Sequence, residues 1–306
     1  MAEISASLVK ELREKSGAGM MDCKKALAET NGDVEAAMDY LRKKGLASAA
    51  KKSGRAAAEG LVSVGTAGNV GVIIELNAET DFVARNDQFQ ALLTKATDVA
   101  LAKKFGTVDA VKSADVGGTT VEAGLTELIA NIGENMTLRR VGLLEVPQGV
   151  VAAYVHNALT ANRGKIGVLV GLESTGDAAK LEAVGRQIAM HIAAQRPEAL
   201  DVASLDQDMV ARERAVHADK AKASGKPAEI IEKMVDGSMR KYYEQVVLLE
   251  QTFIIDGATK ISGVIENLAK EVGAPVKLTS YIRFELGEGV EKKVDDFAAE
   301  VAKMAV

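Results

Sequence analysis

Apolar residues recur at helical spacing in three short stretches near the start of the chain. A first helix is predicted to end at Ser16-Gly17, a second to run from Met20 or Met21 to Leu27, and a third to end at Gly45. The stretch 47–60 contains mainly Ala, Lys, Ser and Gly and has little apolar periodicity. We therefore expect residues 1–46 to form a compact bundle of about three helices, followed by a linker over 47–60 that is helical in part at most.

Residues 61–147 change to a mixed pattern of strands and helices. A hairpin is predicted over 61–77, and the next helix should begin with Asp87 as N-cap, with Gln90 three residues on, and end near Lys104. Then follow a segment over 108–114 to which no element is assigned, a break at Gly117-Gly118, a helical stretch over 121–132 and a strand over 138–146, after which Pro147 ends the unit.

A second copy of this pattern follows, which indicates an internal repeat. Gly68–Asn77 aligns with Gly164–Glu173, with both glycines in register, and each segment leads from a turn into a buried strand. The second copy is predicted over 148–205 plus 247–289. Its elements are strands over 150–155 and 164–172 joined by a turn over 157–164, a helix over 177–195, a helix over 260–271 and a strand over 277–286.

Two highly charged helices interrupt the second copy over residues 206–246. The turn Ser224–Pro227 separates them, which predicts a helical hairpin that projects from the core. The apolar seam expected to pair the two helices consists of Met209, Val216, Ile230, Ile231, Met234 and Val235. Residues 290–306 predict a final amphipathic helix. The expected fold class is α+β, with a duplicated α/β core of small antiparallel sheets and helices between the N-terminal bundle and the C-terminal helix.

The two copies differ in the connection from strand to helix. Sixteen positions separate Gly71 from Asp87 in the first copy, whereas ten separate Gly167 from Asp177 in the second. The longer connection contains Thr80-Asp81-Phe82-Val83, and binding residues tend to lie in such loops. Apolar surface left in water costs about 25 cal/mol per Å². Either these residues fold back on their own hairpin, with Asp81 in a local turn or N-cap, or a partner buries them, and the pattern leaves both interpretations open.

Met20 and Met21 are adjacent on a predicted helix, where successive side chains point about 100° apart. Methionine is usually a core residue, so we expect at most one of the two to face the core and the other to lie near the surface. Together with Gly17 and Gly19, which expose the preceding turn, this arrangement indicates a contact with a partner.

Two long motifs lie in the first third of the chain. Leu12–Leu27 is LREKSGAGMMDCKKAL, and Glu75–Asn86 is ELNAETDFVARN. They resemble the two signatures of the elongation factor Ts family, and the likeness continues to Tyr281–Gly289, so it covers nearly the whole chain. The N-terminal bundle is also similar in layout to ubiquitin-associated (UBA) domains, although layout does not establish function.

The resemblance implies a guanine-nucleotide exchange factor for the GTPase elongation factor Tu, with no cofactor and no covalent chemistry. It implies that Asp81 and Phe82, within Thr80–Val83, press into the GTPase near its magnesium and phosphate region, with Phe82 as the wedge. The other partner-binding residues that it implies are Met20, Met21, Ile132, Gly133 and His156. The turn after His156 is longer here than in the family pattern. In some members of the family an excursion like 206–246 mediates dimerisation, which makes a homodimer an expectation.

Composition narrows the choice of function class. The 306 residues are 47% hydrophobic and 26% charged, which is typical of a folded protein with more than one domain. The net charge of −5 and pI near 5.5 argue against binding nucleic acid through phosphate neutralisation. No apolar stretch approaches the roughly 20 residues of a membrane span. The single cysteine, Cys23, and the absence of a leader pattern favour a reducing compartment, the cytoplasm.

Signatures of enzymes are mostly absent from the sequence. The glycines at 65, 68 and 71 are three residues apart, so they do not form a dinucleotide-binding motif, and no phosphate-binding loop is present. The histidines at 156, 191 and 217 form no helix-spaced pair for a metal, and His191 is expected to be a hydrogen-bonded residue at the edge of the core.

Two further function classes stay open. A non-catalytic adaptor could use the N-terminal UBA-like unit to bind a peptide, in which case the Asp81-Phe82 loop would be dispensable. An enzyme could have its active site between the two repeats, in which case a substrate would turn over without any GTPase present.

Overall fold

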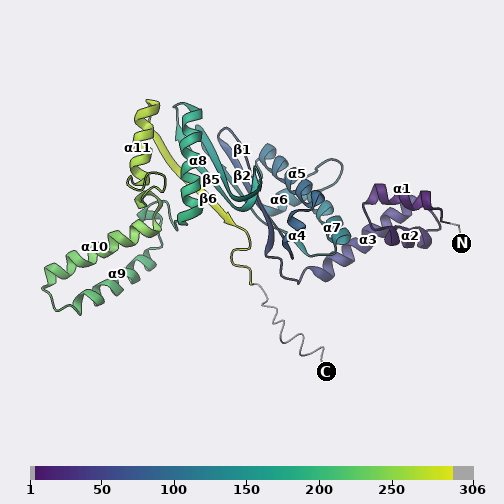
Figure 1. Cartoon of the computed structure of the whole chain (residues 1–306), viewed down its shortest axis with the longest axis horizontal. Helices are drawn as coiled ribbons and strands as arrows, with labels where there is room; N and C mark the ends of the chain where they lie inside the picture. The colour runs from purple at the N-terminus through teal and green to yellow at the C-terminus, as the bar shows by residue number, and fades with distance from the viewer. Residues whose placement is uncertain (1–3, 292–306) are drawn as a thin grey trace, which may run out of the picture. The chain divides into compact units, whose positions relative to one another are not determined.

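The computed structural model describes residues 4–291, which combine helices with a six-stranded sheet, so the predicted α+β class is confirmed (Figure 1). The chain divides into two compact units. The first unit contains the chain up to Ser63, Ile74–Val141 and the chain from Glu285, and the second contains Val64–Ile73 and Gly142–Phe284. The domain boundaries expected from the sequence stay a prediction.

Three helices open the first unit: α1 (Ala6–Ser16), α2 (Met20–Glu29) and α3 (Val34–Lys52). Their shared core is formed by Val9, Leu12, Ala18, Cys23, Ala26, Leu27 and Ala37. The prediction that the third helix ends at Gly45 is wrong, since α3 continues to Lys52. Gly45 lies inside the helix and packs against the helix over Val121–Ile132 (α7), where a Cβ atom added to Gly45 would lie 3.4 Å from Cβ of Ala130.

The rest of the first unit is built around two long helices. Its elements after the first hairpin are α4 (Asp81–Ala84), α5 (Asp87–Lys103), α6 (Val108–Ser113) and α7 (Val121–Ile132). Asn86, not Asp87 as predicted, is the N-cap of α5, because its Oδ1 accepts hydrogen bonds from the backbone N–H groups of Gln88 and Phe89. Asp87 is instead the first residue of the helix, where a carboxylate stabilises the positive end of the helix dipole.

The strands are β1 (Glu59–Ala67), β2 (Val70–Ala78), β3 (Met136–Glu145), β4 (Gly149–Thr160), β5 (Arg163–Ser174) and β6 (Val276–Glu285). Their hydrogen-bonded order is β3-β2-β1-β5-β4, and β6 also pairs with β5. The two predicted hairpins therefore belong to one sheet and not to separate small sheets. Val64 N–H donates to Asn162 O at 3.0 Å, which is one of the bonds that join them.

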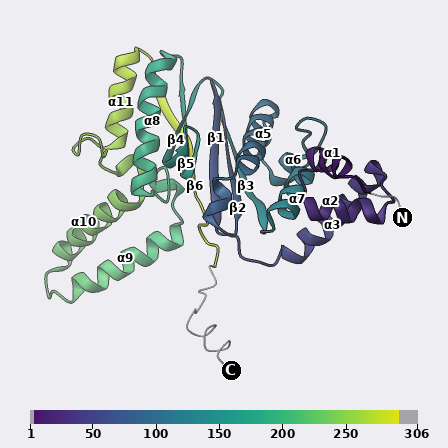
Figure 2. The ribbon, with the colours of Figure 1, turned by 45° about the vertical axis from the view of Figure 1, so that its right-hand side comes forward.

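In the second unit, α8 (Ala178–Gln195) and α11 (Ile261–Val272) lie side by side (Figure 2). They share a core with β5 and β6 that includes Val168, Val170, Leu172, Leu181, Ile188, Ile192, Ile265, Leu268 and Leu278. The predicted long turn over 157–164 is wrong, since β4 and β5 continue toward each other until Thr160 pairs with Arg163. A β-bulge between Ala158 and Thr160 and a left-handed Asn157 (φ 50°) absorb the extra residues.

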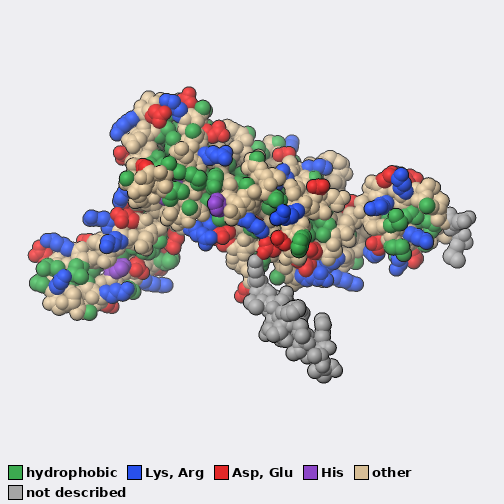
Figure 3. All heavy atoms as spheres, in the orientation of Figure 1, with side chains coloured by type: hydrophobic (Ala, Val, Ile, Leu, Met, Phe, Trp, Pro, Cys, Tyr) green, Lys and Arg blue, Asp and Glu red, His purple; other side chains and the backbone are tan. Residues whose placement is uncertain are grey.

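The inserted hairpin consists of α9 (Gln207–Lys222) and α10 (Ala228–Val246), as the charge pattern predicted. The seam between them agrees with the prediction in part, since Ile231, Met234 and Val235 belong to it. Its buried members are Ala221, Val235 and Met239, with Val210, Ala218, Ile231 and Met234 beside them. Met209, Val216 and Ile230 lie off the seam and are exposed, and Figure 3 shows apolar side chains among the charged ones on this hairpin.

Short 3₁₀ helices at Val202–Ser204 and Leu248–Glu250 flank the inserted hairpin. No helix among residues 4–291 is long and apolar enough to cross a membrane. The final helix predicted over 290–306 falls almost entirely outside the described residues.

Candidate functional site

The turn between β2 and α5 presents a single large apolar side chain to solvent. Asp81–Ala84 form one helical turn, α4, within the segment that the sequence predicted to be a plain loop. Phe82 is 79% exposed, whereas the next residue, Val83, is 3% exposed. The two apolar residues therefore have different roles: Val83 attaches the turn to the core of the first unit, and Phe82 is available to a partner.

A carboxylate from the end of α7 holds the start of this turn. The Thr80 backbone N–H donates to Glu134 Oε2 at 3.0 Å, and the Thr80 hydroxyl donates to Glu134 Oε1 at 2.8 Å. The contact runs in both directions, because Glu79 Oε1 accepts the backbone N–H of Asn135. Asn135 also donates its amide Nδ2 to the carbonyl of Arg55 at 2.7 Å. Glu134 was not predicted as a site residue, although it directly follows Ile132 and Gly133, which were.

The end of the turn is fixed by the helix that follows it. Arg85 N–H bonds to Phe82 O at 3.1 Å, and Asn86 N–H bonds to Val83 O at 2.9 Å. Gln90 Nε2 in α5 donates to Ala84 O at 3.1 Å. Phe82 therefore projects from a turn that is hydrogen-bonded on both sides.

Ile132 and Gly133 lie at the C-terminal end of α7, next to the carboxylate that holds Thr80. Gly133 is the C-cap in the left-handed conformation (φ 88°), and its N–H bonds to Ile129 O. Gly133 is exposed and Ile132 is half-buried. The structure thus brings Ile132 and Gly133 close to the turn that carries Phe82, through Glu134.

Met20 and Met21 begin α2 and are both exposed, at 60% and 76%. This agrees with the expectation that at most one of them faces the core, and Cys23, Ala26 and Leu27 provide the buried face of α2. This leaves two adjacent flexible apolar side chains on the surface of the bundle.

His156 belongs to the second unit, where it is exposed near the end of β4. Its Nδ1 is 3.1 Å from the hydroxyl of Tyr154 on the same strand. His156 lies opposite Ile166 in the sheet, and the residues after it continue the pairing of β4 and β5 where the sequence suggested an open turn.

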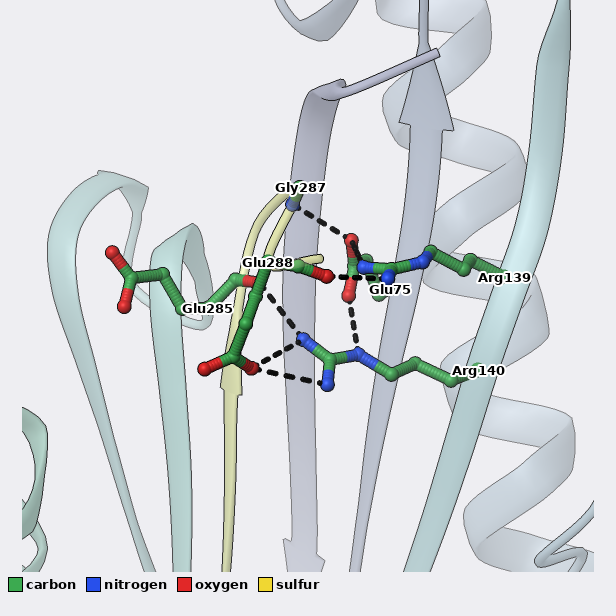
Figure 4. Close-up of polar contacts among 6 residues, drawn as sticks. All are labelled: Glu75, Arg139, Arg140, Glu285, Gly287 and Glu288. Atoms are coloured by element: carbon green, nitrogen blue, oxygen red, sulfur yellow. Dashed lines mark hydrogen bonds and ion pairs between the residues drawn. The ribbon is translucent and has the colours of Figure 1, made fainter. Parts of the chain in front are cut away.

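A buried ion cluster lies on β2 a few residues before the turn (Figure 4). The Glu75 carboxylate is fully buried and accepts from Arg139 Nη1 at 3.0 Å and from Arg140 Nε. Glu75 Oε1 also accepts the backbone N–H of Gly287 at 2.9 Å, and Arg140 reaches Glu288 Oε2 at 3.3 Å. This cluster ties the end of β6 to β2 and β3 within the first unit.

The described residues contain no group of three or more side chains suited to hold a metal ion. His191 is fully buried, with Nε2 2.9 Å from Gln251 Oε1 and Nδ1 accepting the N–H of Ile254 at 3.3 Å. Burial lowers its pKa from the ordinary value, since desolvation disfavours the charged ring. The prediction of a hydrogen-bonded core histidine is therefore confirmed, although His191 lies inside the core and not at its edge.

Residues 79–288 match the family model described as Elongation factor TS. The chain is 64% identical over 307 residues to an elongation factor Ts from Rhodospirillum centenum, with the whole of both chains covered. It is 63% identical to an elongation factor Ts from Paramagnetospirillum magneticum, over 100% of this chain and 98% of the relative. An elongation factor Ts from Rhodospirillum rubrum is 60% identical, over 99% and 98% of the two chains.

Proposed function

The chain belongs to the elongation factor Ts family of translation elongation factors, and from this premise we propose that it is a guanine-nucleotide exchange factor for elongation factor Tu. Its substrate is then a protein complex, the GTPase with bound GDP. No bond within GDP or the GTPase is made or broken, so the activity needs no cofactor and no catalytic residue of the enzymatic kind.

The observation that carries the proposal is the exposure of Phe82 on a braced turn. An aromatic side chain that enters a pocket of a partner can supply a hot spot of about 2 kcal/mol or more. Phe82 is 79% exposed and needs no rearrangement of its own core to reach such a pocket, because Val83 already anchors the turn. Asp81 is also exposed and places a carboxylate beside Phe82. In the complex this negative charge can disturb the binding of the magnesium ion or repel the phosphates of GDP.

Exchange follows from binding linkage. If the factor binds the nucleotide-free GTPase more tightly than the GDP complex, GDP must bind the factor complex more weakly by the same ratio. Phe82 and Asp81 produce this difference in affinity if they fit the GTPase when its nucleotide site is empty and not when GDP occupies it. By the same linkage, GTP that binds the GTPase weakens its affinity for the factor, and the factor is released.

The wider contact surface is proposed to include Met20 and Met21 on α2, and Ile132 and Gly133 beside the turn. Adjacent methionines suit a contact that must adapt to a partner surface, because their side chains are flexible and polarizable. His156, in the second unit, is proposed as a further contact residue. The exposed Met209 and Val216 on α9 support a homodimer through the inserted hairpin.

The test is the release of a fluorescent GDP analogue from purified elongation factor Tu, recorded with and without the unaltered protein. Acceleration that saturates with factor concentration is the expected result. No acceleration would overturn the proposal and favour an adaptor function of the N-terminal bundle.

A further inference from the structure

Two short segments of the first unit, 79–80 and 134–135, hold each other through reciprocal hydrogen bonds. Glu134 accepts both the backbone N–H and the hydroxyl of Thr80, at 3.0 and 2.8 Å. Glu79, next to Thr80, accepts the backbone N–H of Asn135, next to Glu134. Each segment therefore supplies one carboxylate and one backbone donor to the other, which fixes both their separation and their direction.

The turn that carries Phe82 depends on outside anchors for its conformation. Its helix, α4, has four residues, far fewer than an isolated helix needs for stability in water. Thr80 is the N-cap of this helix, but its side chain makes no capping hydrogen bond. The hydroxyl instead donates to Glu134, so the usual local stabilisation of the turn is replaced by a contact with the end of α7.

We propose that Glu134 is a positioning residue for nucleotide exchange, which holds the Asp81-Phe82 turn in the orientation that enters the partner. The inference rests on the proposed exchange function and extends it to residues outside the partner contact. Glu134 acts through Thr80, while Val83 in the core and Asn86 at the start of α5 hold the other side of the turn. Glu79 and Asn135 complete the brace, since the Asn135 N–H that Glu79 accepts fixes the backbone one residue after Glu134.

This role predicts which kinetic constant changes. A turn that samples several orientations still lets the factor dock through its other contacts, but only a fraction of the complexes has Phe82 inserted. The rate of GDP release at saturating factor should fall by that fraction, and the factor concentration for half-saturation should change much less. Loss of partner contact area would instead raise the half-saturating concentration first.

Stopped-flow release of the GDP analogue over a range of factor concentrations separates the two constants. Glu134→Ala should lower the saturating rate about tenfold, because two hydrogen bonds to a charged acceptor are lost. Glu134→Gln should recover most of the rate, since its amide oxygen can accept the Thr80 N–H and its NH₂ can donate to the Thr80 hydroxyl. Combining Glu134→Ala with Thr80→Ala should cost less than the product of the single effects, because both remove the same contact.

The matched control is Glu122→Ala, at the other end of α7. Its carboxylate is exposed and makes a 3.8 Å ion pair with Lys112, so its removal should leave both kinetic constants within about twofold of the unaltered protein. The proposal is overturned if Glu134→Ala equals this control, if Glu134→Gln is as slow as Glu134→Ala, or if the effects at Glu134 and Thr80 multiply fully.

A second measurement does not depend on exchange activity. Hydrogen–deuterium exchange of the Thr80 amide should be slow in the unaltered protein and accelerate about tenfold or more in Glu134→Ala, with no change in Glu122→Ala. A fast Thr80 amide in the unaltered protein would contradict the brace itself. If the amide behaves as expected but the unaltered protein does not release GDP, the proposed function fails while the structural part of the inference stands.

Discussion

The carboxylate of Glu75 accepts the backbone N–H of Gly287 at 2.9 Å, although 212 positions separate the two residues in the sequence. Arg139 and Arg140 flank the same carboxylate, so a buried negative charge is matched by two partly exposed positive charges. The bond joins the strand that leads to the Phe82 turn with the segment that leaves β6. The positions of both segments therefore depend on the side chain of Glu75.

Glu75→Gln should destabilise the first unit by about 3 kcal/mol, because it leaves two clustered guanidinium groups without their buried counter-charge. Urea unfolding followed by circular dichroism measures the change. The surface variant Glu122→Gln serves as control and should cost less than about 1 kcal/mol. Equal stabilities for the two variants would mean that the cluster does not stabilise the fold.

Truncation of adjacent residues in the turn should change the stability by very different amounts. Phe82→Ala should leave the unfolding free energy within about 0.5 kcal/mol, because the side chain lies in solvent. Val83→Ala should lower it by about 2 kcal/mol through loss of buried apolar contacts. Thermal unfolding of both variants checks this, and a large loss in Phe82→Ala would show that Phe82 packs on its own domain.

Stability should fall in mild acid because of His191. Burial lowers the pKa of His191 from the ordinary 6.5, so the folded state binds its proton at lower pH than the unfolded state does. Its contribution is therefore complete above about pH 6.5 and is lost as the pH falls below that value toward the folded pKa. Ring protonation would also remove the acceptor for the Ile254 N–H.

His191→Gln should flatten this part of the pH dependence, whatever its cost in packing at neutral pH. Urea midpoints of both proteins between about pH 8 and pH 5 give the comparison, since the slope reports the difference in bound protons. Parallel slopes for the two proteins would show that other groups cause the acid sensitivity.

The exposed apolar residues of α9 give a test of self-association. Val216→Glu should shift the sedimentation coefficient toward that of a monomer, since it places a charge in the proposed interface. Ala215→Glu adds the same charge on another exposed flank of the helix and should leave the dimer intact. A monomer already in the unaltered protein at micromolar concentration would contradict the proposed homodimer.

Most elements could be predicted from the sequence because their signals are local. Helical spacing places α7, and helical spacing with Asp177 at the start places α8, within a residue or two of the structure. The errors arose where the local pattern does not decide the conformation. Gly45 looks like a helix end, but α3 continues past it against α7. The β4–β5 pairing extends through residues with turn-like composition because a β-bulge between Ala158 and Thr160 shifts the register there.

The site was predictable in part for the same reason. The local pattern identified Phe82 as an apolar residue in a long connection, but it left open whether its own hairpin buries it, and the structure shows that it is exposed. Glu134 could not be assigned a role from sequence, because its partner Thr80 is 54 positions away and many exposed carboxylates look alike. The α9 side of the seam was misplaced because Met209 and Val210 are neighbours, and only the packed helices decide which of the two faces inward.

The most direct test of the exchange mechanism is the rate of GDP release from elongation factor Tu at saturating concentrations of the unaltered protein, Phe82→Ala and Ile255→Ala. Ile255 is also an exposed apolar residue but lies in the second unit, in the segment before α11. The expected result is fast release with the unaltered protein and Ile255→Ala, and release slower by about thirtyfold or more with folded Phe82→Ala. Equal acceleration by all three proteins would contradict the role of Phe82 as the wedge.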